Sequence, residues 1–232
     1  MKNILPAFFL FISIISCAKK NNTDMLPGVN QDTAKTFLAL GDSYTIGESL
    51  SADIRFPVQT ANLLRQREFV ISNPDIVAVT GWTTGNLLDA LNQNPPGKTY
   101  SIVTLLIGVN NQYQGKSLEN YKSEFQELLS RAVVYAGNNV QHVFVLSIPD
   151  YSVTPFANSR DKAKIAREID RFNEANKNIS INAGVNYIDI TPVSRNAKDD
   201  PSLVADDGLH PSGKQYLAWS LLLSESIAKS LK

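Results

Sequence analysis

The chain has 232 residues, which suits a single α/β domain and is long enough to enclose a sizeable hydrophobic core. Lysine plus arginine and aspartate plus glutamate number 22 each, so the formal net charge is zero. This balance argues against nucleic-acid binding, which needs a clustered excess of cations. The single cysteine excludes an internal disulfide and a cysteine-rich metal site.

The N-terminal residues have the pattern of an export signal followed by a tether. An apolar run over residues 4–15 is too short to span a bilayer and has the length of the apolar segment of a secretory signal. It ends at Ile14-Ile15-Ser16-Cys17, which resembles a bacterial lipoprotein processing site, where the cysteine becomes the lipidated first residue. An ordinary cleaved signal with an incidental cysteine, or a short membrane anchor, is the alternative.

We therefore expect residues 1–16 to be a signal peptide, Cys17 to carry a lipid such as palmitate, and residues 17–33 to be a flexible polar tether. This interpretation predicts a protein of the bacterial cell envelope, held to a membrane by its lipid and facing the periplasm or the cell surface.

Residues 34–232 are expected to form one domain, in which short apolar runs alternate with stretches of helical periodicity. Strands are predicted over residues 37–40, 75–80, 100–107, 140–148 and 185–190. Helices are predicted over residues 57–67, 84–91 and 161–182, after Ser117, and from about Pro211. Five apolar strands alternating with helices indicate a parallel sheet covered on both faces. Ligands bind such sheets at the carboxyl ends of the strands.

A histidine in a loop at that edge is the candidate base. His142 lies within an apolar strand and is interpreted as structural or surface-exposed, whereas His210 lies just before the last helix. A neutral imidazole is the usual base for a serine hydroxyl. Asp207, three residues earlier, can reach the ring because Gly208 permits a tight turn. Asp206 competes for this role, and the alternative is that both aspartates only cap the turn.

Ser43 is the candidate nucleophile because it follows Gly41-Asp42 at the end of the first strand, on the first strand-to-helix loop. Asp42 is expected to make local turn hydrogen bonds and not to belong to the triad. Gly81 and Asn110 follow the second and third strands and can supply a backbone N–H and a side-chain amide to a developing oxyanion. Each is weak evidence alone, since turns use the same residues. Their joint placement at successive strand ends carries the interpretation.

These residues resemble the four sequence blocks of the SGNH (GDSL-type) hydrolase family, in the family's order. The blocks are Gly41-Asp42-Ser43-Tyr44, Gly81, Gly108-Val109-Asn110-Asn111 and Asp207-Gly208-Leu209-His210. The resemblance implies a flavodoxin-like three-layer α/β/α sandwich with a five-stranded parallel sheet. It also implies Ser43 as nucleophile, with Asp207 and His210 completing the triad, and an oxyanion hole made by the N–H groups of Ser43 and Gly81 and the Asn110 side chain. No metal or organic cofactor is implied. Tyr44 stands where the family has leucine, and Asn111 where it has aspartate.

The expected function is a serine esterase that forms an acyl-enzyme on Ser43 and hydrolyses carboxylic esters of small acyl groups such as acetyl, or a lysophospholipid. The substrate is then a small-molecule, carbohydrate or lipid ester. Acyl transfer to an alcohol by the same triad, and a tethered binding protein that has lost turnover, are the alternatives. A monomer with a shallow site is expected, and Trp82, Tyr113 and Tyr151 are the candidate lining residues.

Overall fold

The computed structural model describes residues 34–232. The predicted signal peptide (residues 1–16), Cys17 and the tether (residues 17–33) lie outside the described residues. Within residues 34–232, the helices lack the combination of length and apolar character that a membrane crossing requires.

Five parallel strands form a single sheet in the order β2-β1-β3-β4-β5. They are β1 (Phe37–Gly41), β2 (Asp75–Ala78), β3 (Ile102–Leu106), β4 (Val143–Leu146) and β5 (Asn186–Ile188). This is the flavodoxin-like strand order: β2 is added on one side of β1, and β3, β4 and β5 follow on the other side, so the switch point lies between β1 and β3. The predicted fold class is confirmed.

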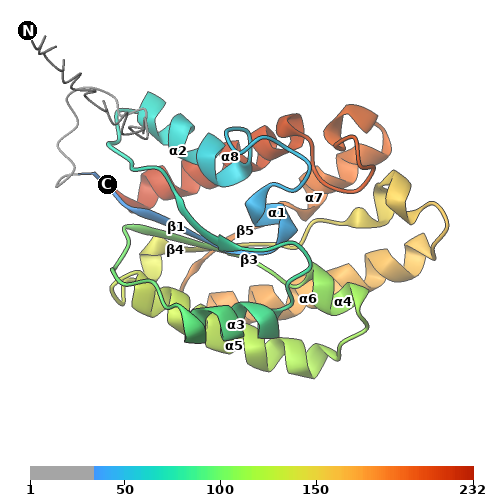
Figure 1. Cartoon of the computed structure of the whole chain (residues 1–232), viewed down its shortest axis with the longest axis horizontal. Coiled ribbons are helices and arrows are strands. Elements are labelled where there is room, and N and C mark those ends of the chain that lie inside the picture. The colour runs from blue at the N-terminus through green and yellow to red at the C-terminus, as the bar shows by residue number, and fades with distance from the viewer. Residues whose placement is uncertain (1–33) are drawn as a thin grey trace, which may run out of the picture.

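Helices cover both faces of the sheet (Figure 1). The α-helices are α1 (Ser43–Ile46), α2 (Phe56–Gln66), α3 (Thr84–Gln93), α4 (Val109–Tyr113), α5 (Leu118–Tyr135), α6 (Lys162–Asn182), α7 (Thr191–Arg195) and α8 (Gly213–Ser230). Short 3-10 turns are η2 (Val140–His142), η3 (Tyr151–Val153), η4 (Pro155–Ala157), η5 (Asn196–Lys198) and η6 (Pro201–Leu203). Helices α2 and α8 pack together on one face, and α3, α5 and α6 lie on the other (Figure 1).

The long helices begin where a side chain can accept an otherwise unpaired N–H group. Ser117, Asp161 and Ser212 each accept a hydrogen bond from the third residue of their own helix, and Thr83 forms a capping box with Asn86. Each such cap contributes about 1 kcal/mol. These local signals are readable in the sequence, so the long helices begin within a few residues of their predicted starts.

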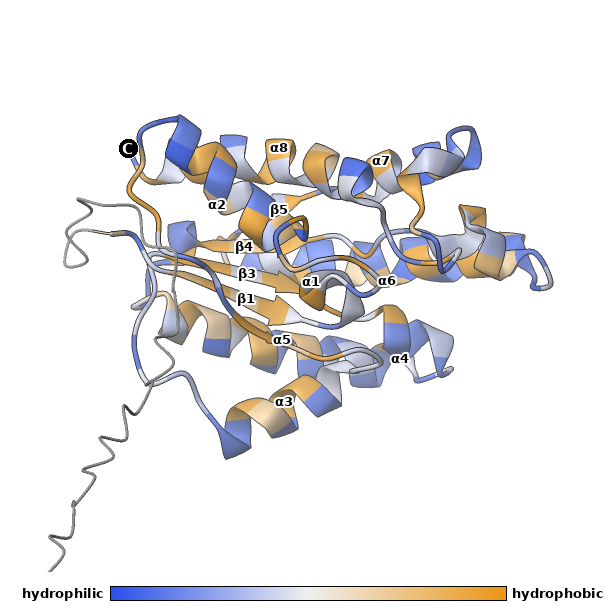
Figure 2. Ribbon diagram, turned by 45° about the horizontal axis from the view of Figure 1, so that its top comes forward, coloured by the Kyte–Doolittle hydropathy of each residue, from blue (hydrophilic) through white to orange (hydrophobic). Residues whose placement is uncertain are grey.

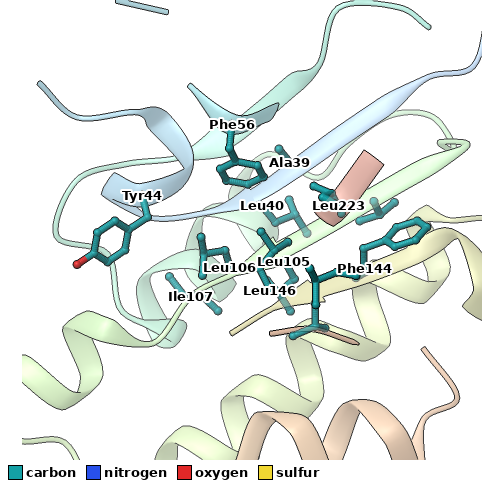
Figure 3. Close-up of a cluster of buried hydrophobic side chains, with 14 of the residues drawn as sticks. Ala39, Leu40, Tyr44, Phe56, Leu105, Leu106, Ile107, Phe144, Leu146 and Leu223 are labelled. Carbon is teal, nitrogen blue, oxygen red and sulfur yellow. The ribbon is translucent and has the colours of Figure 1, made fainter. Parts of the chain in front are cut away.

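The central strands lie in the hydrophobic core. Every residue of β1, β3 and β4 is buried, whereas the edge strands β2 and β5 are only partly covered. Apolar residues therefore form continuous runs in the central strands, whereas apolar and polar residues alternate along the helices (Figure 2). The buried residues of the long helices join the same hydrophobic core as the strands. Burial of each large aliphatic or aromatic side chain contributes about 1.5–3 kcal/mol. Leu40 and Leu105 are register partners in β1 and β3, and Phe144 and Leu223 belong to the same cluster of buried side chains (Figure 3).

Four of the five predicted strands are too long at their ends, because apolar character continues beyond the paired ladder, whereas β1 ends one residue later than predicted. The predicted strand over residues 140–148 begins only at Val143, where pairing with β3 starts. Asn139 accepts the N–H of Gln141 and turns the preceding residues into η2. His142 therefore lies in a 3-10 turn and not in a strand. It lies at the amino ends of the strands, the edge opposite Ser43, and burial lowers its pKa.

Candidate active site

Ser43 lies at the carboxyl end of β1 as predicted, but it is the first residue of the short helix α1 and not part of a strand-to-helix loop. The side chain of the preceding Asp42 accepts the N–H of Tyr44 at 3.0 Å, and its carbonyl accepts the N–H groups of Thr45 and Ile46. These bonds hold the helical turn on the end of the strand. The Ser43 side chain is thereby presented to a cavity, with the residue 5% exposed.

Asp42 is fully buried and supports this turn from inside the protein. Burial raises the pKa of its carboxyl to about 7, although backbone N–H groups act against the increase. One carboxyl oxygen accepts the N–H of Tyr44, and the other is buried with no hydrogen-bond partner in residues 34–232. Asp42 makes the local turn hydrogen bond that the sequence predicts and does not line the cavity.

Asp207 and His210 are hydrogen-bonded across a tight turn, with 2.5 Å between Asp207 Oδ2 and His210 Nδ1. Gly208 adopts φ +72°, which allows the turn. Asp207 Oδ1 accepts the backbone N–H groups of Leu209 and His210, both at 2.9 Å. Asp206, the competing carboxylate, is exposed and makes no hydrogen bond to the described part of the chain.

The Asp207 carboxylate stays ionised over the neutral and mildly acidic range. Partial burial by itself would raise its pKa, but the hydrogen bonds from Ser49, His210 and the backbone outweigh it and hold the pKa well below the usual range. Because an ionised carboxylate can only accept, His210 Nδ1 is the donor of the bond between them. A neutral His210 then carries its lone pair on Nε2, the nitrogen needed to take a proton from a hydroxyl.

Gly81 and Asn110 line the same cavity as Ser43 and His210. Gly81 has φ +85°, a conformation that glycine adopts without strain. Asn110 is the second residue of helix α4, and not in a loop as predicted. Its side-chain amide donates to the carbonyl of Trp82 at 3.0 Å, which orients the amide and leaves its second N–H available. The N–H groups of Ser43 and Gly81 have no acceptor within residues 34–232.

Ser43 and His210 are not hydrogen-bonded to each other in the structure, although both line the cavity. Such bonds are often long before a substrate binds and tighten in the reacting complex.

Tyr44, at the position where the family has leucine, packs its ring edge-on against His210, with 5.7 Å between the ring centroids. Tyr44 sits on α1 at one end of the core cluster (Figure 3).

Asn111, where the family has aspartate, joins α4 to the first turn of α3. Its fully buried side chain accepts the N–H of Thr84 at 3.0 Å and donates to the Thr84 hydroxyl at 2.6 Å. The Thr84 hydroxyl in turn donates to the carboxylate of Glu124. An aspartate would compete with Glu124 for the single hydroxyl proton, whereas an amide supplies a donor of its own. The change from aspartate to asparagine therefore fits the carboxylate nearby and leaves Asn110 in place.

The cavity measures about 170 Å³ and has an aromatic and aliphatic wall. Its lining residues are Ser43, Tyr44, Thr80, Gly81, Val109, Asn110, Tyr113, Tyr151, Phe156, Leu209 and His210. Tyr113 and Tyr151 line it as predicted, but Trp82 does not. Phe156 was not predicted from the sequence, because only the 3-10 turn η4 brings its ring against Tyr113 and Tyr151.

Within residues 34–232, histidine, cysteine and carboxylate side chains form no group of three suited to a metal ion.

Replacing Asn110 by alanine is expected to lower kcat by about 10²- to 10³-fold with little change in KM, because an oxyanion donor acts mainly in the transition state. Asn110→Asp keeps the size of the side chain but places an acceptor where a donor is needed, so it should be equally impaired. Steady-state kinetics on p-nitrophenyl acetate measures both effects. A kcat within about threefold of wild type in either variant would exclude this role for Asn110.

Comparison with known proteins gave one family match. A model of the GDSL-like Lipase/Acylhydrolase family matches residues 39–218. The comparison with curated proteins gave no match.

Solved structures share the fold at low sequence identity. The psychrotrophic esterase EstA from Pseudoalteromonas sp. is 19% identical, with a TM-score of 0.62 over 85% of this chain and 98% of its own. Axe2, an acetylxylan esterase from Geobacillus stearothermophilus, is 18% identical, with a TM-score of 0.59 over 86% and 94%. A member of the lipolytic protein G-D-S-L family from Veillonella parvula is 15% identical, with a TM-score of 0.62 over 83% and 97%. At these identities the similarity concerns the fold alone.

Proposed function

We propose that this protein cleaves esters of short acyl groups through an acyl-enzyme on Ser43. The premise is that the chain belongs to the GDSL-like lipase/acylhydrolase family and is a carboxylic ester hydrolase. The observation that carries the proposal is the 2.5 Å hydrogen bond between Asp207 and His210, on the same cavity that Ser43 lines. The pair supplies a base with a fixed tautomer beside a hydroxyl.

In the proposed reaction, His210 Nε2 takes the Ser43 proton while Ser43 Oγ attacks the ester carbonyl. The negative charge that develops on the carbonyl oxygen is received by the N–H groups of Ser43 and Gly81 and by the free N–H of the Asn110 amide. His210 then gives its proton to the departing alkoxide, and Asp207 stabilises the imidazolium in the interval. A water molecule deprotonated by His210 then attacks the acyl-enzyme, and His210 gives that proton to Ser43 Oγ as its bond to the acyl carbon breaks, which releases the acid and restores both residues.

The cavity supports a short acyl group. A cavity of about 150 Å³ is large enough for a benzene molecule, so about 170 Å³ accommodates a group of roughly that size. Val109, Tyr151 and Phe156 offer it an apolar surface. An acetyl to butyryl group fits inside this volume, whereas most of a palmitoyl chain would lie outside it in contact with water.

The test is chain-length preference on p-nitrophenyl esters from acetate to palmitate. We expect kcat/KM to be greatest between acetate and butyrate and to fall at least about tenfold by octanoate, since methylenes that find no apolar contact contribute no binding energy. Ser43→Ala, measured in parallel, corrects for spontaneous hydrolysis. A kcat/KM that rises toward palmitate would reject the short-acyl assignment and favour a lysophospholipid substrate.

We infer further that Cys17 bears a lipid that holds the domain to an envelope membrane. The support is the sequence pattern at residues 14–17, which lies outside the described residues. Replacement of Cys17 by serine is expected to abolish incorporation of radiolabelled palmitate and to move the enzyme from the membrane fraction to the soluble fraction. Labelling of the variant equal to that of wild type would reject the anchor.

A further inference from the structure

The chain that follows α1 forms a tight turn that reaches the carboxylate of the proposed triad. The N–H groups of Gly47 and Glu48 bond to the carbonyl of Ser43, and the N–H of Leu50 bonds to the carbonyl of Gly47 at 3.1 Å. Ser49, the third residue of this turn, has φ +66°. A non-glycine residue in the left-handed region is uncommon and is retained where the surroundings give it a compensating contact.

The compensating contact of Ser49 is made with Asp207, 158 positions later in the chain. Ser49 Oγ donates to Asp207 Oδ2 at 2.5 Å. His210 Nδ1 bonds to the same oxygen at the same distance. A hydroxyl has a single proton, and an ionised carboxylate can only accept, so the direction of this bond is settled. The nucleophile's own helix is thus connected through one short turn to the carboxylate that orients the base.

We propose that Ser49 is a positioning residue for the esterase reaction: its hydroxyl holds Asp207 Oδ2 where that oxygen accepts the hydrogen bond of His210 Nδ1. This inference rests on the proposed function of Ser43, Asp207 and His210. Ser49 touches neither the cavity nor the reacting atoms, and acts only through Asp207.

The need for such a contact follows from the exposure of the carboxylate. The Asp207 side chain is 28% exposed, so water can reach it. Two backbone N–H groups hold Oδ1, whereas within residues 34–232 Oδ2 accepts only from His210 Nδ1 and Ser49 Oγ. Without Ser49, a mobile water would take its place on Oδ2, and the carboxylate would lose a fixed donor beside the imidazole. A correctly held imidazole is what the triad aspartate contributes to catalysis.

The experiment uses Ser49→Gly in the full-length enzyme. Glycine removes the hydroxyl and also relieves the left-handed backbone, so the variant should melt at the same temperature as wild type or higher. We expect kcat on p-nitrophenyl acetate to fall about tenfold, as for loss of one charge-assisted hydrogen bond, while KM stays within about twofold because no substrate contact is lost.

Glu68→Gly is the matched control. Glu68 is exposed just after the end of α2, has φ +67°, and does not line the cavity, so the same relief of backbone strain should leave kcat unchanged. A second control measures Ser49→Gly in the Asp207→Ala background. If Ser49 acts through Asp207, the substitution should change kcat there by less than about twofold.

Three results would overturn the inference: an unchanged kcat in Ser49→Gly, an equal loss in Glu68→Gly, or an undiminished Ser49→Gly effect when Asp207 is absent. The failure of the proposed function looks different. In that case Asp207→Ala and Ser43→Ala would themselves retain wild-type kcat, whatever happens at Ser49.

Discussion

Replacement of Ser43 by alanine is expected to lower kcat/KM on p-nitrophenyl acetate by at least about 10⁴-fold, because removal of the nucleophile of a serine hydrolase leaves only oxyanion stabilisation and binding. The fold should be unaffected. Ser43 Oγ makes no hydrogen bond within residues 34–232, so its loss leaves no buried group without a partner.

A fluorophosphonate probe gives the direct measurement, since it phosphonylates only an activated serine. The wild-type protein should be labelled and Ser43→Ala should not. Ser130→Ala is the matched control, because Ser130 is exposed on α5 and bonds to the carbonyl of its own helix at Gln126. Equal labelling of wild type and Ser43→Ala would reject Ser43 as the nucleophile.

The second large effect is expected for Asp207→Asn, which should lower kcat by about 10⁴-fold, as this exchange does in other enzymes with a Ser-His-Asp triad. An asparagine can still accept the N–H groups of Leu209 and His210 through its oxygen, so the turn is preserved. Its NH₂ group then faces His210 Nδ1 and can only donate. The ring must accept there and carry its proton on Nε2, which can no longer receive the proton of Ser43.

Asp206→Asn is the control for this substitution. Asp206 is exposed and adjacent to Asp207, so the exchange removes the same charge from a neighbouring side chain. It should keep wild-type kcat, and both variants should show the circular dichroism spectrum of wild type. If Asp207→Asn retained more than about a tenth of wild-type kcat, the carboxylate would not be setting the tautomer of His210.

Much of the fold was predictable from the sequence because its signals are local. Continuous apolar runs indicated the central strands, and the capping residue Ser117 indicated where the helix after it begins. The helices α1 and α4 were not predicted, since four or five residues are too few to show a helical period. The bonds of Asp42 to the N–H groups of Tyr44, Thr45 and Ile46 close α1.

The sequence by itself determined which residues fall at the carboxyl ends of the strands, because the polar residues that follow an apolar run mark where it ends. Ser43, Gly81 and Asn110 were placed at that edge in this way, and the spacing of Asp207 and His210 allowed their contact. Only the tertiary structure decided which side chains come together at that edge of the sheet. Pairing of β1 with β3 places the first residues of α1 and α4 on one cavity, and the turn after α1 brings Ser49 to Asp207. Contacts between side chains so distant in the chain depend on the strand order and backbone angles, which no local pattern of residues encodes.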